Sequence, residues 1–284
     1  MNFDRTWLVA VEYGSNNETS LDRFLAANER KFGCKCIRVR TDILPGQILD
    51  NPNEAFEFSG YQEGLGRVLM EANEILSPDA SDLPINVVFF NDTLITGHVA
   101  PLSKILIEEL LRQHCRPGSE SAFMGLRMPL DDPTRLVTGE QAYISTWAFA
   151  LSGPRSAFEG LRFYEADEVL TPFDASFFSK LPLAYLEALR TWLEPTNLLR
   201  GWYKAIPGRP LSDSEKMRKM LSIYIEHTLP KRLLRHGFRT KDVTVQLRGW
   251  RSKPLQWLRL LDRVYVNYLK VRYRLSALCG LEKI

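Results

Sequence analysis

Three short runs of strand-forming residues, separated from one another by helical patterns, most constrain what this chain can fold into. The runs are residues 7–12, 36–40 and 85–90, and the last is a nearly continuous series of β-branched and aromatic side chains. In the intervening segments 19–32 and 60–75, apolar residues recur at the three- and four-residue spacing of an amphipathic helix. Strands that alternate with helices pair in parallel, so the sequence predicts an α/β fold in which helices cover the sheet.

The rest of the chain continues with both kinds of element. Residues 102–114 have a helical pattern, and residues 122–127 and 142–151 are expected to form strands. Residues 214–238 have a helical pattern too, with a break expected at Pro230 because proline lacks the N–H that an inner helical turn uses. The chain has no internal repeat and no low-complexity segment, as is typical of a globular protein.

Charge divides the chain into an acidic body and a basic tail. The formal net charge is only +3, but residues 211–284 carry 17 Lys and Arg against 6 Asp and Glu, and residues 1–210 have an excess of eight acidic groups. A basic tail attracts nucleic acid, anionic lipid or an acidic partner protein, and its charge alone does not choose among them.

The sequence shows no sign of export. The first apolar run has only strand length and is followed directly by Glu12, which is wrong for a secretory signal, and no run approaches the ~18 apolar residues of a membrane span. The four cysteines have neither the density of a disulfide scaffold nor the paired spacing of a zinc site. We therefore expect a cytoplasmic protein with reduced thiols.

Polar residues that follow the run at 85–90 are the first candidates for chemistry. Asn91 and Asp92 come directly after it, and ligands of open parallel sheets bind at the carboxyl ends of strands. Asp92 is a candidate ligand for a divalent cation that bridges diphosphate oxygens, with a helix N-cap as its alternative role. His98, six residues on, is a candidate for the same site or a structural residue.

A glycine-rich segment, residues 57–66, opens the second helical pattern. Its three glycines allow backbone N–H groups to approach a phosphate or a sugar, and they suit a tight entry into a helix equally well. Ser59 and Gly60 are the candidate ligand-binding positions of this segment.

A further candidate is Glu226, in the expected helix 214–238. Leu229 follows it by three residues and Arg232 by six, and a Gly-Phe pair ends the segment. A carboxylate held beside a ligand can act as a general base, and Arg232 is expected to keep Glu226 ionised. The alternative is an ordinary surface pair of Glu and Arg on a helix.

Together and in this order, these segments resemble the GT-A-fold glycosyltransferases of bacterial polysaccharide synthesis, of the family-2-like and rhamnan-synthesis-like kinds. The resemblance covers about residues 6–245. The matching parts are a first strand leading to the nucleotide site, a glycine-rich helix start, a strand ending in the donor motif, a strand near the acceptor and a helix carrying the base, here residues 7–13, 57–64, 90–94, 143–149 and 226–238.

The resemblance implies a GT-A-like, Rossmann-like mixed sheet flanked by helices in residues 1–245, followed by a basic helical extension in residues 246–284. It also implies that Glu226 is the base of an inverting displacement. The residues expected to bind the donor are Glu12, Tyr13, Asp42, Ser59, Gly60, Asn91 and Asp92. The residues expected on the acceptor side are His98, Thr146, Trp147 and Arg232.

The implied activity is transfer of a sugar from a nucleotide-sugar donor to a glycan or lipid-linked acceptor, in cell-surface polysaccharide synthesis of the O-antigen or capsule kind. Two positions depart from the family pattern. Asp92 is the single carboxylate where the family has Asp-x-Asp to hold Mn²⁺ or Mg²⁺, and Glu226 stands where Asp is usual. The alternative is a catalytically inactive relative, or a binding module whose basic tail binds nucleic acid or a partner protein.

Residues 255–275 form a strong amphipathic pattern. One face of the expected helix carries aromatic and aliphatic side chains, among them Trp257, Val264 and Tyr268, and Arg and Lys flank that face. The pattern suits a helix lying on an anionic membrane surface, which would place the protein on the inner face of the membrane, near a lipid-linked acceptor. Packing of this face on the catalytic domain or on a second subunit is the alternative. Because the aromatic residues share the apolar face, no nucleic acid is expected.

Overall fold

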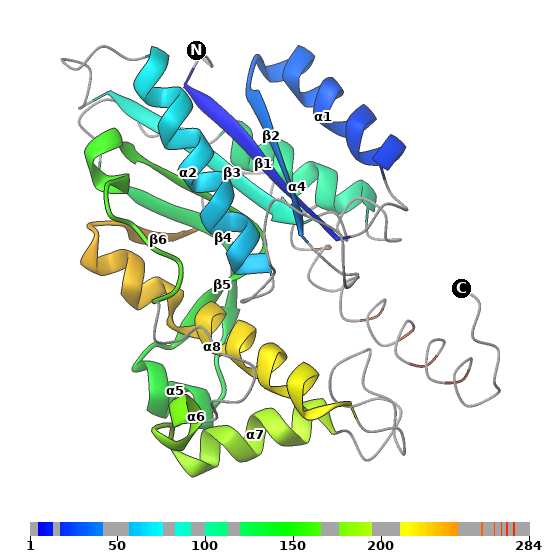
Figure 1. The fold of residues 1–284 in the computed structure, drawn as a ribbon, viewed down its shortest axis with the longest axis vertical. Coiled ribbons are helices and arrows are strands. Elements are labelled where there is room, and N and C mark those ends of the chain that lie inside the picture. Colours follow the sequence, from blue (N-terminus) through cyan, green and yellow to red (C-terminus); the bar gives the residue numbers. More distant parts are fainter. Residues whose placement is uncertain are drawn as a thin grey trace.

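The computed structural model contains a six-stranded sheet with the strand order β2-β1-β3-β5-β4-β6 (Figure 1). The strands are β1 (Thr6–Tyr13), β2 (Lys35–Thr41), β3 (Pro84–Asn91), β4 (Ala122–Pro129), β5 (Ala142–Pro154) and β6 (Arg239–Asp242). The structure describes residues 5–13, 18–41, 57–75, 83–91, 100–112, 120–165, 176–194 and 211–243, and the single helical residues Trp257, Val264, Tyr268, Val271 and Leu275.

The sheet is mixed. β1 pairs in parallel with both β2 and β3, which confirms the pairing expected from strands that alternate with helices. β5 runs antiparallel to β3 and to β4, and β6 pairs in parallel with β4. The expected α/β fold, with a mixed sheet flanked by helices, is confirmed.

Helices cover both faces of the sheet, because side chains alternate between the faces along each strand. Val9 and Val11 belong to the core under α2 (Glu57–Ile75) and α8 (Asp213–Arg235). Leu8 and Ala10 belong to the core on the opposite face, under α1 (Glu18–Phe32) and α4 (Ala100–Arg112). The expected helices 19–32 and 60–75 are thus present, the second beginning three residues early.

Shorter helices gather at one end of the molecule, beside α8 (Figure 1). They are α5 (Asp132–Thr138), α6 (Ser176–Ser179) and α7 (Leu183–Leu193), whereas η3 (Arg155–Phe158) follows β5 at the other end of that strand. The side chain of Asp131 caps α5 by accepting from the N–H of Thr134, and Gly139, with a φ of 71°, ends it in the left-handed conformation. Buried Tyr185 and Leu189 of α7 extend the core that lies under α2 and α8.

Two glycines let α2 approach the sheet closely. A Cβ atom at Gly60 would lie 2.5 Å from Cγ1 of Val11, and a Cβ at Gly64 would overlap the side chain of Val9. Any larger residue would push the helix away from β1. Close packing of α2 on β1 therefore explains these two glycines, and their binding of a phosphate or sugar stays a prediction.

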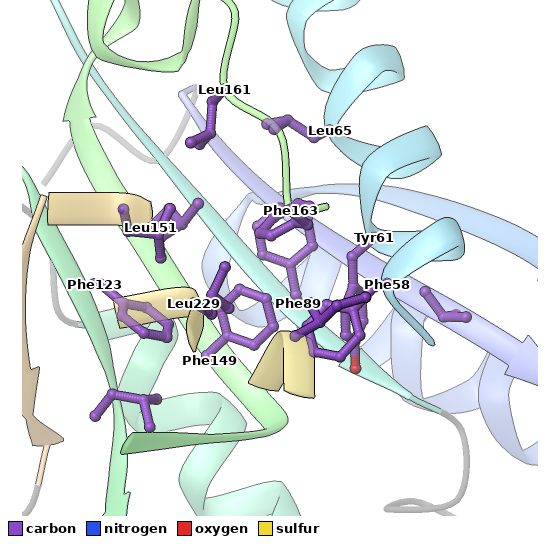
Figure 2. Close-up of a cluster of buried hydrophobic side chains, with 14 of the residues drawn as sticks. Phe58, Tyr61, Leu65, Phe89, Phe123, Phe149, Leu151, Leu161, Phe163 and Leu229 are labelled. Atoms are coloured by element: carbon purple, nitrogen blue, oxygen red, sulfur yellow. The ribbon is translucent and has the colours of Figure 1, made fainter. Parts of the chain in front are cut away.

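An aromatic cluster joins α2 to the middle of the sheet (Figure 2). The rings of Phe89 in β3 and Phe149 in β5 stack with centroids 4.9 Å apart. Tyr61 of α2 meets Phe149 edge-to-face at 5.2 Å, and Phe58 meets Tyr61 at 5.9 Å. These contacts fix the position of Tyr61, whose hydroxyl bonds to β5.

The expected break at Pro230 is wrong, since α8 is one helix from Asp213 to Arg235. Proline fits the φ of a helix and removes a single donor, the one that would bond to the carbonyl of Glu226. Leu229, Pro230 and Leu233 are all buried, so packing offsets the missing hydrogen bond.

Candidate functional site

Several elements meet at one edge of the sheet, where β1, β2 and β3 end; we call this the carboxyl-terminal edge. Phe90 of β3 is paired with Ala148 of β5, so the residues just before Ala148 lie beside the end of β3. The first turn of α2 reaches the same edge, because Gly60 packs against Val11 near the end of β1. This edge is where open α/β sheets bind ligands.

Two residues named from the sequence, Glu226 and Thr146, meet at this edge. Oε1 of Glu226 accepts a hydrogen bond from the backbone N–H of Thr146 at 2.9 Å and another from Oγ1 of Thr146 at 2.9 Å. Thr146 is buried, and Glu226 is half-buried. The contact ties α8 to β5 and holds one carboxylate oxygen in a fixed place.

Residues of α2 complete a hydrogen-bonded cluster around Thr146. The hydroxyl of Tyr61 donates to the carbonyl of Thr146 at 2.9 Å. Oγ of Ser222, one turn before Glu226, donates to Oε1 of Glu57 at 3.2 Å. We call Glu57, Tyr61, Thr146, Ser222 and Glu226 the carboxylate cluster.

The sequence interpretation missed Glu57, Tyr61 and Ser222 as parts of a site. A signal was present, because the two pairs 57/61 and 222/226 each have the four-residue spacing that puts both side chains on one face of a helix. That spacing is common on any helix, so it identifies the pairs only once α2 and α8 are known to pack together.

Burial governs the charge state of Glu226. Removal from water raises the pKa of its carboxyl group above the ordinary value, and the negative charge of Glu57 acts in the same direction. The hydrogen bonds from Thr146 and the charge of Lys219 oppose this rise. A raised pKa makes the carboxylate a stronger base, which suits proton abstraction near neutral pH.

The expectation that Arg232 keeps Glu226 ionised is wrong, whereas its place on the acceptor side stays a prediction. Its Nη1 lies 3.2 Å from Oε1 of Glu165, and the pKa of Glu226 is raised rather than held low. Six residues along a helix turn the side chain by roughly 240°, so Arg232 projects from a different side of α8 than Glu226.

His227 is a second titratable group in α8 that the sequence interpretation did not select. Its Nδ1 lies 3.2 Å from the hydroxyl of Tyr185, and its ring meets Tyr143 at 4.9 Å. Burial lowers the pKa of His227 to about 4, although the charge of Asp131 opposes the shift. The imidazole is therefore neutral at neutral pH.

The donor-side candidates are divided between the two faces of the sheet. Glu12 is buried, and Arg38 binds its carboxylate with both guanidinium contacts at 2.6 Å, with Arg40 at 3.4 Å. By strand alternation Glu12 points toward the α1 face, whereas Asn91 points toward the α2 face with the carboxylate cluster. Ser59 and Gly60 are buried in the first turns of α2.

Some sequence predictions fall on residues that the structure does not describe. Asp42, Asp92 and His98 lie outside the described residues, as does the side chain of Tyr13, whose backbone ends β1. Among the residues that are described, no three His, Cys, Asp or Glu side chains lie together in a way that could hold a metal ion. The divalent metal at Asp92 stays a prediction.

Trp147 directly follows Thr146 and is 37% exposed, which is unusual for so large an apolar side chain. Trp147 is the neighbour in β5 of Thr146, which binds Glu226, and its side chain is accessible to solvent. Aromatic rings with one accessible face are suited to covering the apolar face of a bound molecule.

A scan against protein-family models found no match to this chain, and searches of curated proteins and of solved structures found none either. In the part of the chain that the structure describes, no helix combines the length and apolarity that crossing a bilayer requires.

Proposed function

We propose that this protein is a glycosyltransferase that moves a sugar from a nucleotide-sugar donor to a glycan or lipid-linked acceptor. The observation that carries the proposal is the Glu226 carboxylate, anchored on Thr146 at the carboxyl-terminal edge with a raised pKa. The order of segments that resembles the GT-A family supports the choice of sugar transfer over other base-catalysed reactions.

In this mechanism Glu226 takes the proton of the acceptor hydroxyl. Thr146 holds Oε1, so Oε2 is the atom to which we assign the proton. The acceptor oxygen then bonds to the anomeric carbon while the bond from that carbon to the diphosphate breaks, which inverts the configuration. Trp147 is the ring proposed to cover the acceptor sugar.

The departing diphosphate gains negative charge that the site must offset. Asn91 ends β3 at the carboxyl-terminal edge, Asp92 follows it, and amide and carboxylate oxygens are the ligand types that Mg²⁺ and Mn²⁺ prefer. A cation held there would supply the compensating charge.

Glu226→Gln is the decisive substitution, because the amide oxygen of Gln can still accept both hydrogen bonds from Thr146 but cannot take a proton. A thermal-shift screen of nucleotide sugars first identifies the donor. We expect Glu226→Gln to keep the donor-induced rise in Tm and to lower kcat by about 10²- to 10⁴-fold. The proposal fails if no nucleotide sugar is bound or turned over by the wild-type protein.

A second candidate is a catalytically inactive relative that acts as a binding module. Glu12, expected at the donor site, is instead neutralised by Arg38 and Arg40, an arrangement that serves the fold without any ligand. Filter binding of DNA and RNA across a salt series tests the nucleic-acid form of this candidate. Tight, salt-sensitive binding together with no nucleotide-sugar turnover would favour it.

A further inference from the structure

Two cysteines that have no part in the candidate site lie at the start of β2. Cys34 directly precedes the strand and Cys36 is its second residue, so that only Lys35 separates them. Residues two apart along an extended chain point to the same face of a sheet. Both side chains belong to the core beneath α1, where Leu8 is the β1 partner of Cys36. We call Cys34 and Cys36 the dithiol pair.

The two sulfur atoms of the dithiol pair are in contact with each other. The S–H of Cys36 donates to the sulfur of Cys34, and Sγ of Cys36 also lies 3.6 Å from the carbonyl oxygen of Leu25 in α1. Both cysteines have free thiols. Cys34 is only 1% exposed, whereas Cys36 is partly exposed. The pair therefore lies directly beneath the surface, within reach of a small molecule.

The contact gives the two thiols different reactivities. The hydrogen bond from Cys36 lowers the pKa of the Cys34 thiol, although burial of the sulfur opposes this shift. The same hydrogen bond raises the pKa of Cys36, and burial acts in the same direction. Because the thiolate is the form that attacks an oxidant, Cys34 is the nucleophile of the pair and Cys36 is the second thiol beside it.

The spacing of the backbone permits a disulfide within the dithiol pair. At the rise of a strand, about 3.3 Å per residue, their Cα atoms lie roughly 6.6 Å apart, just inside the upper limit of about 6.8 Å for disulfides. Cys34 lies outside β2, in the two-residue connection from α1, so its backbone can adjust while the strand pairing from Lys35 onward is kept. A disulfide closed near this limit is strained, and strained disulfides are readily reduced.

We propose that the dithiol pair is a reversible oxidation site that forms a disulfide with hydrogen peroxide as the oxidant. The Cys34 thiolate attacks one oxygen of the peroxide, the O–O bond breaks, and a sulfenic acid and a hydroxide ion form. The Cys36 sulfur then bonds to the Cys34 sulfur while the S–O bond breaks, and the leaving hydroxide takes up the Cys36 proton. The two thiols thus lose two hydrogen atoms, and the peroxide is reduced to two molecules of water.

Thiol titration of the full chain tests the proposal. The substitution Cys115→Ser/Cys279→Ser first removes the two cysteines that lie outside the described residues, so that every remaining thiol belongs to the dithiol pair. We expect hydrogen peroxide to abolish both thiols of this protein and to lower its mass by that of two hydrogen atoms. Dithiothreitol should restore both thiols and the original mass.

Trypsin locates the bond within the chain, because Lys35 stands between the two cysteines. Cleavage after Lys31, Lys35 and Arg38 gives the peptides 32–35 and 36–38, each with one cysteine. After peroxide treatment we expect these two peptides to be recovered as one disulfide-linked species, which reduction separates.

Cys36→Ser/Ile37→Cys, made in the same background, is the matched control. It keeps two thiols but moves the second to the opposite face of β2 and roughly 10 Å along the strand from Cys34, which is too far for a disulfide. Its mass should instead rise by the oxygen added at Cys34. Circular dichroism establishes that the control stays folded. Cys36→Ser alone should gain oxygen in the same way, and it serves as the control if Ile37→Cys disturbs the core.

Four outcomes overturn the proposal. They are survival of both thiols in excess peroxide, oxidation that dithiothreitol does not reverse, an equally fast disulfide in the matched control, and disulfides that form only between molecules. None of these readouts depends on sugar transfer, so the oxidation proposal and the glycosyltransferase proposal fail or stand separately.

Discussion

Glu226 shows what a sequence reveals of a single residue and what it conceals. Its spacing from Leu229 and from the Gly-Phe pair singled it out, yet the residue that fixes its carboxylate, Thr146, lies 80 positions earlier. Only the packing of α8 on β5 brings the two together. Glu57 and Tyr61 were missed for the same reason. Their hydrogen-bond partners, Ser222 for Glu57 and Thr146 for Tyr61, lie far from them in the sequence.

His227 gives the protein a predictable response to acid. Its pKa is about 4 when folded and about 6.5 when unfolded, so the unfolded chain takes up a proton first as the pH falls. The contribution of the buried, neutral imidazole to the free energy of unfolding is fully present above pH 6.5 and is lost as the pH falls to 4. Its size is roughly 3 kcal/mol.

Urea unfolding of the wild type and His227→Gln at a series of pH values measures this contribution. We expect the free energy of unfolding of the wild type to fall more steeply between about pH 6.5 and pH 4. The neighbouring Glu226 has a raised pKa and acts in the opposite direction, but it is present in both proteins and cancels in the comparison. If the free energies of unfolding of the wild type and of His227→Gln change with pH in parallel, the imidazole is not buried as described.

At the scale of elements, the pattern of apolar residues predicted those strands and helices whose apolar side chains pack in the core. The strands β1, β2 and β3 were predictable because each is a buried run of apolar residues. β6 was not, since its four residues, Arg239 to Asp242, contain three charged side chains and pair only with the edge of β4. The break predicted at Pro230 was wrong, because rules based on the local sequence do not take account of the packing of Leu229 and Leu233 in the core.

The packing of α2 on the sheet predicts opposite effects for two neighbouring glycines. Gly64→Ala places a methyl group against Val9 in the core and should lower the free energy of unfolding by about 1 to 3 kcal/mol. At Gly66 no atom lies within 4 Å of the place that a methyl group would take, so Gly66→Ala should raise stability by up to about 1 kcal/mol through helix propensity. Chemical denaturation measures both, and equal effects at the two positions would contradict the close approach of α2 to β1.

At the scale of the whole molecule, the order of the strands determines how far along the chain the folded sheet domain extends. β6 covers the outer edge of β4, and Phe238 and Val243 on either side of it are fully buried. The side chains of Trp257, Val264, Tyr268 and Leu275, by contrast, are exposed. The sheet domain should therefore need the chain as far as residue 243 and should not need residues 251–284.

Two truncations test this boundary. A chain that ends at residue 250 keeps β6 and Val243, so it should stay soluble and unfold cooperatively with a Tm close to that of the full chain. A chain that ends at residue 238 loses both and leaves the hydrogen-bonding edge of β4 open, which promotes pairing between molecules. We expect the second chain to aggregate or to unfold at a clearly lower temperature, as light scattering and thermal unfolding would measure. An insoluble first chain would instead mean that residues 251–284 are part of the core.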